Sequence, residues 1–181
     1  MLDASEYLHL AIHASQEGNH HAALNYLNTA LEHEPNHAGA RYFLAAEHAE
    51  LGLLERAHTG MKAALELDSG MDIARFQLGL LSLQLQRTAE AQEAFESLQR
   101  VTLDTSLQTF AGAYLDLLSE NAQEAIAKLS LGLNTCVNQA LHADMSRVLA
   151  SLTELVPETE SSSPTERPVF LGAYRNTFET P

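Results

Sequence analysis

Four alanines recur along this chain at one fixed interval, each 34 positions after the last: Ala23, Ala57, Ala91 and Ala125. Three further sets of four residues keep the same interval: Leu27, Met61, Phe95 and Leu129; Ala30, Ala64, Leu98 and Gly132; and Leu10, Leu44, Leu78 and Gly112. An interval of this length is typical of proteins built from stacked helical repeats, and not of a globule around a buried active site.

The composition favours an all-α fold. Hydrophobic residues make up 45% of the 181 residues, but aromatic residues make up only 6% and Trp is absent. The core must therefore be built mainly from Leu and Ala, which are strong helix formers.

Each repeat is expected to fold as two amphipathic helices joined by a short turn. In the first repeat Gly18 and Asn19 interrupt the helical pattern, and Pro35 ends the repeat. A solenoid needs cover for its last hydrophobic face, so the apolar stretch after the fourth repeat is expected to be a capping helix. The expected repeats are 4–37, 38–71, 72–105 and 106–137, followed by the capping helix 138–155.

The first repeat resembles the tetratricopeptide repeat (TPR) family, and the resemblance extends over residues 4–137. It rests on these residues of the first repeat: Tyr7, Leu10, Ala11, Gly18, Ala23, Leu27, Ala30 and Pro35. The resemblance implies a right-handed superhelical solenoid of four helical hairpins, and a concave groove that holds a peptide. Another solenoid of helical hairpins is the alternative.

The first helix of each repeat carries two apolar stripes. In the third repeat Leu78 and Gly79 are expected to face the paired helix, whereas Phe76, Leu80 and Leu83 lie on the other side. The TPR resemblance implies that this second stripe lines the groove. The predicted groove residues are Leu8, Ile12, Tyr42, Phe76, Leu80, Leu83, Phe110, Tyr114 and Leu117. The alternative is that these side chains pack against each other or the capping helix and form core.

The C-terminal end supplies a candidate occupant for that groove. Residues 156–168 are rich in Pro, Ser, Thr and Glu, which predicts a flexible linker, and residues 169–181 follow as an aromatic tail motif. The residues of this motif are Phe170, Leu171, Tyr174 and Phe178. We expect the tail to cover the groove in cis or in a swapped dimer. The alternative is a disordered tail that carries a linear motif or has no role.

No pattern of catalytic or cofactor-binding residues stands out. The sequence has no P-loop, no dinucleotide-binding glycine motif and no Gly-x-Ser-x-Gly motif, so neither catalytic residues nor a cofactor are expected. His9 and His13 have the spacing of a metal pair but no obvious third ligand, so no metal site is expected. The histidine-rich first repeat is expected to respond to pH between about 5 and 7. Glu47 and Glu50 have the spacing of a solvated helix face, and Cys136 is expected to be a small buried side chain.

The net charge of the chain limits the classes of partner that it can bind. A net charge of −14 disfavours nucleic acid and anionic membranes as partners. No signal peptide or membrane span is visible, and the single cysteine favours a cytoplasmic location. We therefore expect a non-enzymatic adaptor or chaperone that binds an apolar segment of another protein. A self-assembling scaffold, or a regulatory subunit of an enzyme or secretion complex, is the alternative.

Overall fold

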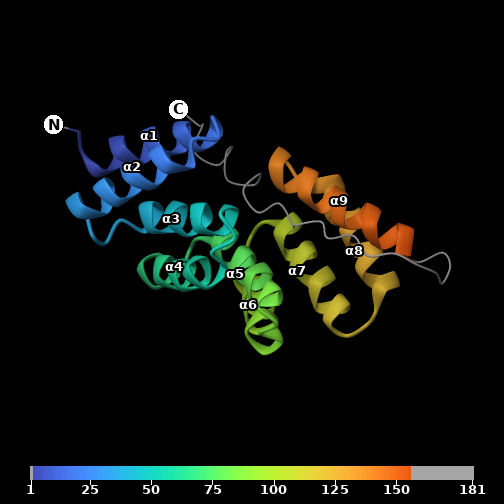
Figure 1. The fold of residues 1–181 in the computed structure, drawn as a ribbon. Coiled ribbons are helices and arrows are strands. Elements are labelled where there is room, and N and C mark those ends of the chain that lie inside the picture. The colour runs from blue at the N-terminus through green and yellow to red at the C-terminus, as the bar shows by residue number, and fades with distance from the viewer. Residues whose placement is uncertain (1, 156–181) are drawn as a thin grey trace. The chain divides into compact units, whose positions relative to one another are not determined.

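The computed structural model describes residues 2–155, which form nine α-helices and no strands (Figure 1). The linker 156–168 and the tail motif 169–181 lie outside the described residues. In chain order the helices are α1 (Ala4–Gln16), α2 (His20–His33), α3 (Ala38–Glu50), α4 (Leu54–Leu67), α5 (Asp72–Gln84), α6 (Thr88–Val101), α7 (Thr105–Leu118), α8 (Ala122–Thr135) and α9 (Gln139–Leu155). The all-α prediction is confirmed.

The chain divides into two compact bodies, with the boundary between Ala94 and Phe95 inside α6. In the N-terminal body α1 packs against α2, α3 against α4, α2 against α3 and α4 against α5. In the C-terminal body α7 packs against α8, and α8 against α9. Each helix therefore contacts mainly its neighbours along the chain, as in a helical repeat protein. No helix in residues 2–155 is long and apolar enough to cross a membrane.

The turn inside each helical hairpin is the same in all four repeats. The residue that follows the C-cap of the first helix has a positive φ, and these four residues keep the repeat interval: Gly18 (74°), Gly52 (74°), Gln86 (59°) and Glu120 (60°). The next residue donates its amide five positions back, as in the 2.8 Å bond from Asn19 N to Ala14 O. These are Schellman motifs, which satisfy the last carbonyls of a helix by means of one left-handed residue.

In the second helix of each repeat, the apolar residues that recur every 34 positions face the interior. Each set of equivalent residues is called a column here. The alanines Ala23, Ala57, Ala91 and Ala125 are all fully buried, and so are Leu27, Met61, Phe95 and Leu129. The third column, which runs from Ala30 to Gly132, is buried as well. The recurring columns of these helices thus mark the core, as the sequence predicts.

The prediction for the two stripes of the first helices is only partly right. Gly79 of the stripe expected to face the paired helix is buried, and so are Ala11, Ala45 and Ala113 at the equivalent positions. The stripe expected to face the paired helix is partly open, because Leu10 is 39% exposed and Leu44 and Leu78 are half-buried. The other stripe is core: Phe76 is 1% exposed and Phe110 is fully buried.

A charged contact joins the first two repeats. The sequence pattern predicts Glu47 on a solvated face, but this side chain is only 2% exposed, and its carboxylate lies 2.8 Å from Nδ1 of His20. The pair connects α2 to α3. A buried carboxylate needs such a partner, because the desolvation of an unpaired charge is expensive.

The last helix, α9, covers part of α8. It buries Leu141 and Met145 and leaves Val148 and Leu152 half-buried. The exposed apolar surface of the last hairpin is reduced in this way, which is the role of a terminal helix in a repeat protein.

Candidate functional site

The predicted groove residues fall into two classes. Five are buried: Leu8, Tyr42, Phe76, Phe110 and Tyr114. Four are half-buried: Ile12, Leu80, Leu83 and Leu117. The aromatic side chains expected at the centre of an open groove are therefore part of the packed interior, and only aliphatic residues of this stripe reach solvent.

Local packing explains why the aromatic rings are enclosed. The Tyr42 ring meets Phe43 edge-on at 5.3 Å, and Tyr114 stacks on Phe95 with the ring centroids 5.1 Å apart. A Cβ atom at Gly132 would lie 2.5 Å from the Phe110 ring, so the missing side chain of Gly132 makes the space that this ring occupies. Burial also raises the pKa of the Tyr114 hydroxyl. These rings supply core packing energy.

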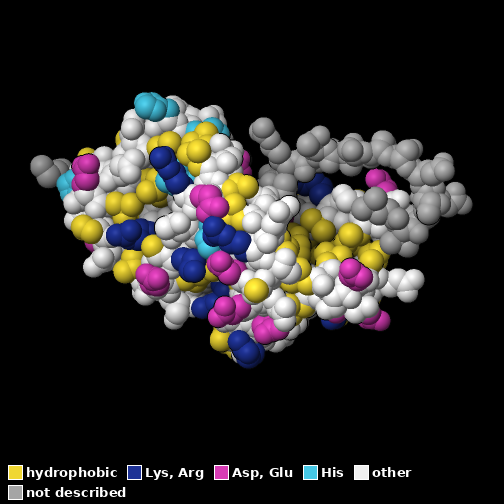
Figure 2. Space-filling model, turned by 60° about the horizontal axis from the view of Figure 1, so that its bottom comes forward, with side chains coloured by type: hydrophobic (Ala, Val, Ile, Leu, Met, Phe, Trp, Pro, Cys, Tyr) yellow, Lys and Arg dark blue, Asp and Glu magenta, His cyan; other side chains and the backbone are white. Residues whose placement is uncertain are grey.

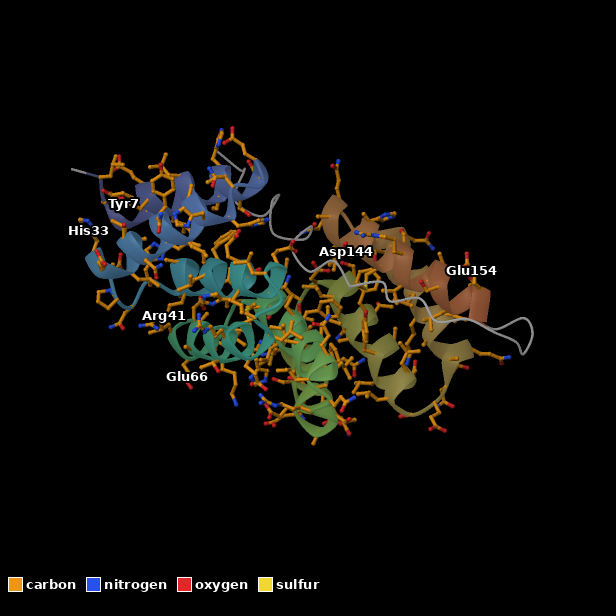
Figure 3. All side chains as sticks on the ribbon, in the orientation of Figure 1. Tyr7, His33, Arg41, Glu66, Asp144 and Glu154 are labelled. Carbon is orange, nitrogen blue, oxygen red and sulfur yellow. The ribbon has the colours of Figure 1, made fainter. Side chains whose placement is uncertain are left out.

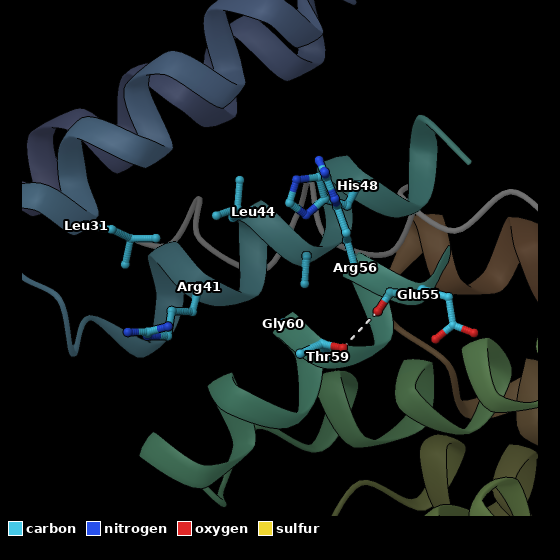
Figure 4. A pocket seen from close by; sticks show the side chains of 9 residues that line it. Leu31, Arg41, Leu44, His48, Glu55, Arg56, Thr59 and Gly60 are labelled. Carbon is cyan, nitrogen blue, oxygen red and sulfur yellow. Dashed lines mark hydrogen bonds between the residues drawn. The ribbon is translucent and has the colours of Figure 1, made fainter. Parts of the chain in front are cut away.

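The N-terminal body carries a pocket elsewhere, between α3, α4 and the end of α2 (Figure 4). Its volume is about 420 Å³, within the usual range for binding sites in proteins. The lining residues are Leu31, Arg41, Leu44, Ala45, His48, Glu55, Arg56, Thr59 and Gly60. None of the predicted groove residues lines it.

The first two repeats differ in the side chains that lie at this place. In the first repeat Tyr7 and Tyr26 lie between α1 and α2 with their ring centroids 6.4 Å apart, and Tyr7 also lies 5.4 Å from His33 (Figure 3). The equivalent residues one repeat later are Arg41 and Gly60. The second repeat therefore lacks both rings at the place where the pocket lies. The third repeat, with Arg75 and Ala94 at these positions, lacks the rings too but has an alanine side chain where the second repeat has Gly60.

Gly60 also lets the two helices approach closely. A Cβ atom at Gly60 would lie 2.9 Å from Cβ of Ala45, which is too close without a shift of α3 or α4. The glycine thus fixes the distance between the two helices and leaves the pocket floor without a side chain.

Arg41 has a structural role. Its Nε and one terminal nitrogen both donate to the carbonyl of Pro35, at 2.9 and 2.7 Å. Arg75, one repeat later, makes the same kind of bond to the carbonyl of Ser69 at 2.6 Å. Both arginines therefore fasten the loop that precedes their helix, and two of the five N–H donors of Arg41 are used in this way.

The carboxylate of Glu55 is held outside the pocket by Arg87, which donates to both of its oxygens at 3.0 and 2.8 Å. Figure 4 shows the Glu55 side chain directed away from Leu44. Arg87 also lies 3.1 Å from Nδ1 of the buried His58, while Nε2 of that ring lies 3.0 Å from the Glu90 carboxylate. A guanidinium can only donate, so Nδ1 accepts and the neutral ring carries its proton on Nε2. Burial lowers the pKa of His58.

Like Arg41, which donates only to a neutral carbonyl, Arg56 is a basic group of the pocket that no carboxylate of residues 2–155 neutralises. It lies beside His48 (Figure 4), and its guanidinium has no hydrogen bond or ion pair within residues 2–155. Burial and then the charge of Arg56 lower the pKa of His48, against an opposing effect of Glu47. His48 is therefore mainly neutral at pH 7, and the pocket combines an apolar floor with two arginines, Arg41 and Arg56, that have no carboxylate partner within residues 2–155. The face drawn in Figure 2 likewise shows Lys and Arg side chains next to hydrophobic ones.

The C-terminal body has a second hollow of about 480 Å³, lined by Glu96, Gln99, Arg100 and Gln108. Its lining is polar, so it offers less apolar surface to a partner than the pocket on α3 and α4. In the same body burial raises the pKa of the half-buried Cys136 thiol, which makes it a poor nucleophile.

The described part of the chain holds no group of three or more side chains that could bind a metal ion. His13 instead lies 3.5 Å from Glu17 on the surface of α1.

Solved structures share this fold over most of the chain. The repeat protein in the APC/C complex Cut9–Hcn1 matches with a TM-score of 0.75 and 19% identity, over 86% of this chain and 31% of that one. PilF of Pseudomonas aeruginosa matches with a TM-score of 0.65 and 21% identity, over 87% of this chain and 78% of that one. YrrB, a TPR protein with an unusual peptide-binding site, matches with a TM-score of 0.61 and 17% identity, over 86% and 80% of the two chains. The chain has the tetratricopeptide-repeat fold.

The similarity is one of fold and not of sequence. No protein-family model and no curated protein matches this chain. The chain spans less than a third of the length of the Cut9–Hcn1 repeat protein. The TPR resemblance drawn from the repeat interval is therefore confirmed at the level of the fold.

The pocket is not among the features predicted from the sequence, although the sequence contains a signal for it. Aligning the first two repeats places Arg41 under Tyr7 and Gly60 under Tyr26. The loss of two large rings at neighbouring positions of one repeat indicates either a repacked core or an opening. Only the coordinates show that it is an opening.

Proposed function

We propose that this TPR protein is a non-catalytic adaptor or chaperone that holds an apolar segment of another protein in the pocket between α3 and α4. One observation carries the proposal: the second repeat lacks the rings of Tyr7 and Tyr26, and the space they would fill is lined by Leu31 and Leu44. The likeness to TPR structures, among them a protein with a peptide-binding site, supports an interaction module in general.

The size of the pocket fits a short contact. Burial of one or two leucine-sized side chains contributes roughly 1.5–3 kcal/mol each, before the ordering of the peptide is subtracted. The gross gain is thus at most about 6 kcal/mol, so a single segment of this kind is expected to bind weakly, with a dissociation constant no tighter than tens of micromolar. Additional contacts on other surfaces of the partner would strengthen the complex.

The test fills the pocket without removing a core contact. Thr59 lines the pocket from the exposed side of α4, and its hydroxyl bonds only to the Glu55 carbonyl of its own helix, at 2.9 Å. Thr59→Trp should keep the melting temperature close to that of the unchanged protein and block the pocket. Affinity purification of the Thr59→Trp variant, followed by mass spectrometry, should then no longer recover the partner that the unchanged protein captures.

Asn25→Trp is the matched control, because Asn25 is the equivalent exposed residue one repeat earlier, on α2. It adds the same indole to the first repeat, away from the pocket. The proposal fails if both tryptophan variants capture the same proteins as the unchanged chain. It also fails if both lose them equally, because the effect would then not be specific to the pocket.

We further propose that the tail motif 169–181 competes with the partner for this protein. The motif concentrates Phe170, Tyr174 and Phe178 in a short segment, and aromatic side chains are the usual anchors of protein interfaces. Deletion of residues 157–181 should raise the affinity for the partner or change the oligomeric state seen by light scattering. If neither quantity changes, the tail has no such role.

A further inference from the structure

We propose that the segment bound in the pocket of α3 and α4 is acidic as well as apolar, and that Arg56 binds its carboxylate while Leu31 and Leu44 receive a neighbouring apolar side chain. The inference deepens the proposed function and rests on it. The ligand chemistry is a carboxylate next to a Leu-like side chain, supplied either by Asp or Glu or by a chain terminus.

The distribution of charge in the protein carries this inference. The chain has 24 acidic and 10 basic residues, so an arginine near its surface is expected to find a carboxylate. Most Lys and Arg side chains of residues 2–155 do so: Lys62, Arg75, Arg87, Lys128 and Arg147. The exceptions in that range are Arg41, Arg56 and Arg100, and two of them, Arg41 and Arg56, line the pocket. Arg41 donates to the Pro35 carbonyl, whereas the Arg56 guanidinium makes no hydrogen bond within residues 2–155.

The surroundings of Arg56 keep its charge uncompensated. Among the described residues that line the pocket only Glu55 is acidic, and its two carboxylate oxygens accept from Arg87. Arg41 adds a second positive charge, because it donates only to the neutral Pro35 carbonyl, and the neutral His48 adds no negative charge. The pocket therefore has a positive local charge in a strongly acidic protein, and an acidic segment is complementary to it.

The geometry places charge and apolar surface within one binding site. Figure 4 shows His48 and Arg56 next to each other at one end of the pocket, Leu31 and Arg41 toward the other, and Leu44 between them. A guanidinium binds a carboxylate through two parallel hydrogen bonds, which also fixes the orientation of the bound group. A segment with an acidic residue beside an apolar one can therefore satisfy both ends together.

The test uses synthetic peptide arrays as the probe. One array presents random heptapeptides with amidated ends, and a second presents the same sequences with free carboxyl termini. The unchanged protein should retain peptides enriched in Asp or Glu beside Leu, Ile or Phe, and Thr59→Trp should abolish their retention. Enrichment confined to the second array would identify a chain terminus as the source of the carboxylate.

Arg56→Glu should reverse the preference toward Lys and Arg, while Arg100→Glu, the same change at an exposed arginine of the C-terminal body, should leave it unchanged. Arg56→Gln is a second variant that removes the charge without adding a new one. Against one selected peptide it should weaken binding about two- to fivefold. It should also reduce the loss of affinity between low and high salt.

The outcomes separate the two proposals. If peptides bind and Thr59→Trp removes them, but acidic residues are not enriched or Arg56→Glu selects the same peptides, this inference is wrong and the proposed function stands. If no peptide shows binding that depends on Thr59, both are wrong.

Discussion

The four turn residues with positive φ provide a test of the repeat geometry. Replacing a glycine there by alanine should lower the stability of the protein, and replacing a non-glycine residue there by glycine should raise it. Gly52 and Gln86 occupy equivalent places in successive repeats, at φ of 74° and 59°. Glycine adopts this conformation without strain, whereas other residues do not. Gly52→Ala should therefore destabilise the protein, and Gln86→Gly should stabilise it.

The magnitude follows from two opposing terms. A left-handed conformation costs a non-glycine residue roughly 1–2 kcal/mol. Replacing glycine by alanine restricts the unfolded chain, which returns about 0.4–1 kcal/mol. No atom lies within 4 Å of a Cβ placed at Gly52, so no clash adds to the difference. The free energy of unfolding should therefore fall by about 1 kcal/mol in Gly52→Ala and rise by about 1 kcal/mol in Gln86→Gly. For a chain of this length, either change corresponds to a shift of about 2–4 °C in melting temperature.

Thermal melts followed by circular dichroism measure both variants, and urea unfolding checks that the m-value stays the same. Gly18→Ala and Glu120→Gly repeat the experiment in the first and fourth repeats. A Gly52→Ala protein that melts at or above the temperature of the unchanged chain would refute the reasoning. So would a lower melting temperature for Gln86→Gly.

The remaining predictions concern burial and pH. Phe76→Asp should abolish cooperative folding because it buries an unpaired charge, whereas Leu78→Asp on the half-buried stripe should fold; circular dichroism distinguishes them. Gly132→Ala should cost about 1–3 kcal/mol because its Cβ meets Phe110, and an unchanged urea midpoint would contradict that packing. The lowered pKa of His58 means that the unfolded chain binds this proton more readily, so stability should fall as pH drops below about 6.5. Melts from about pH 7.5 to about pH 5 should show a smaller loss in His58→Gln.

The repeat interval is enough to predict the helices and the buried residues of the second helix in each repeat. The columns of the second helices, such as Ala23 to Ala125, are buried in every repeat because the same close packing recurs from one repeat to the next. The turns recur for the same reason. Glycine marks only two of them, so the conformations of Gln86 and Glu120 can be inferred only from their alignment with Gly18 and Gly52.

The first helices cannot be assigned from periodicity, because both of their stripes are apolar. Periodicity reports where the stripes lie but not which one faces the partner helix. The sequence predicts that Leu10, Leu44 and Leu78 lie in the interior, but these leucines are partly exposed. The interior is occupied by the larger rings of the other stripe, such as Phe76 and Phe110. Size is the useful signal, since the stripe with more apolar surface gains more free energy from burial.

The burial and pairing of the charged and titratable side chains depend on contacts between repeats. The spacing of Glu47 and Glu50 indicates a solvated face, but His20 of the preceding repeat covers Glu47. The sequence predicts a pH response in the first repeat. That response stays a prediction, and the lowered pKa values that the structure gives are those of His48 and His58 in the second repeat, where burial is the main cause. Neither burial nor pairing across repeats follows from a helical pattern alone.

The most direct test of the binding site is a nuclear magnetic resonance titration with a peptide selected on the arrays. We predict that amide signals of α3 and α4 shift, centred on Leu44, His48 and Thr59, and that Thr59→Trp prevents the shifts. Shifts centred instead on Leu80 and Leu83 would place the partner on the other stripe of the repeats. That result would contradict the central claim that the missing rings of the second repeat create the binding site.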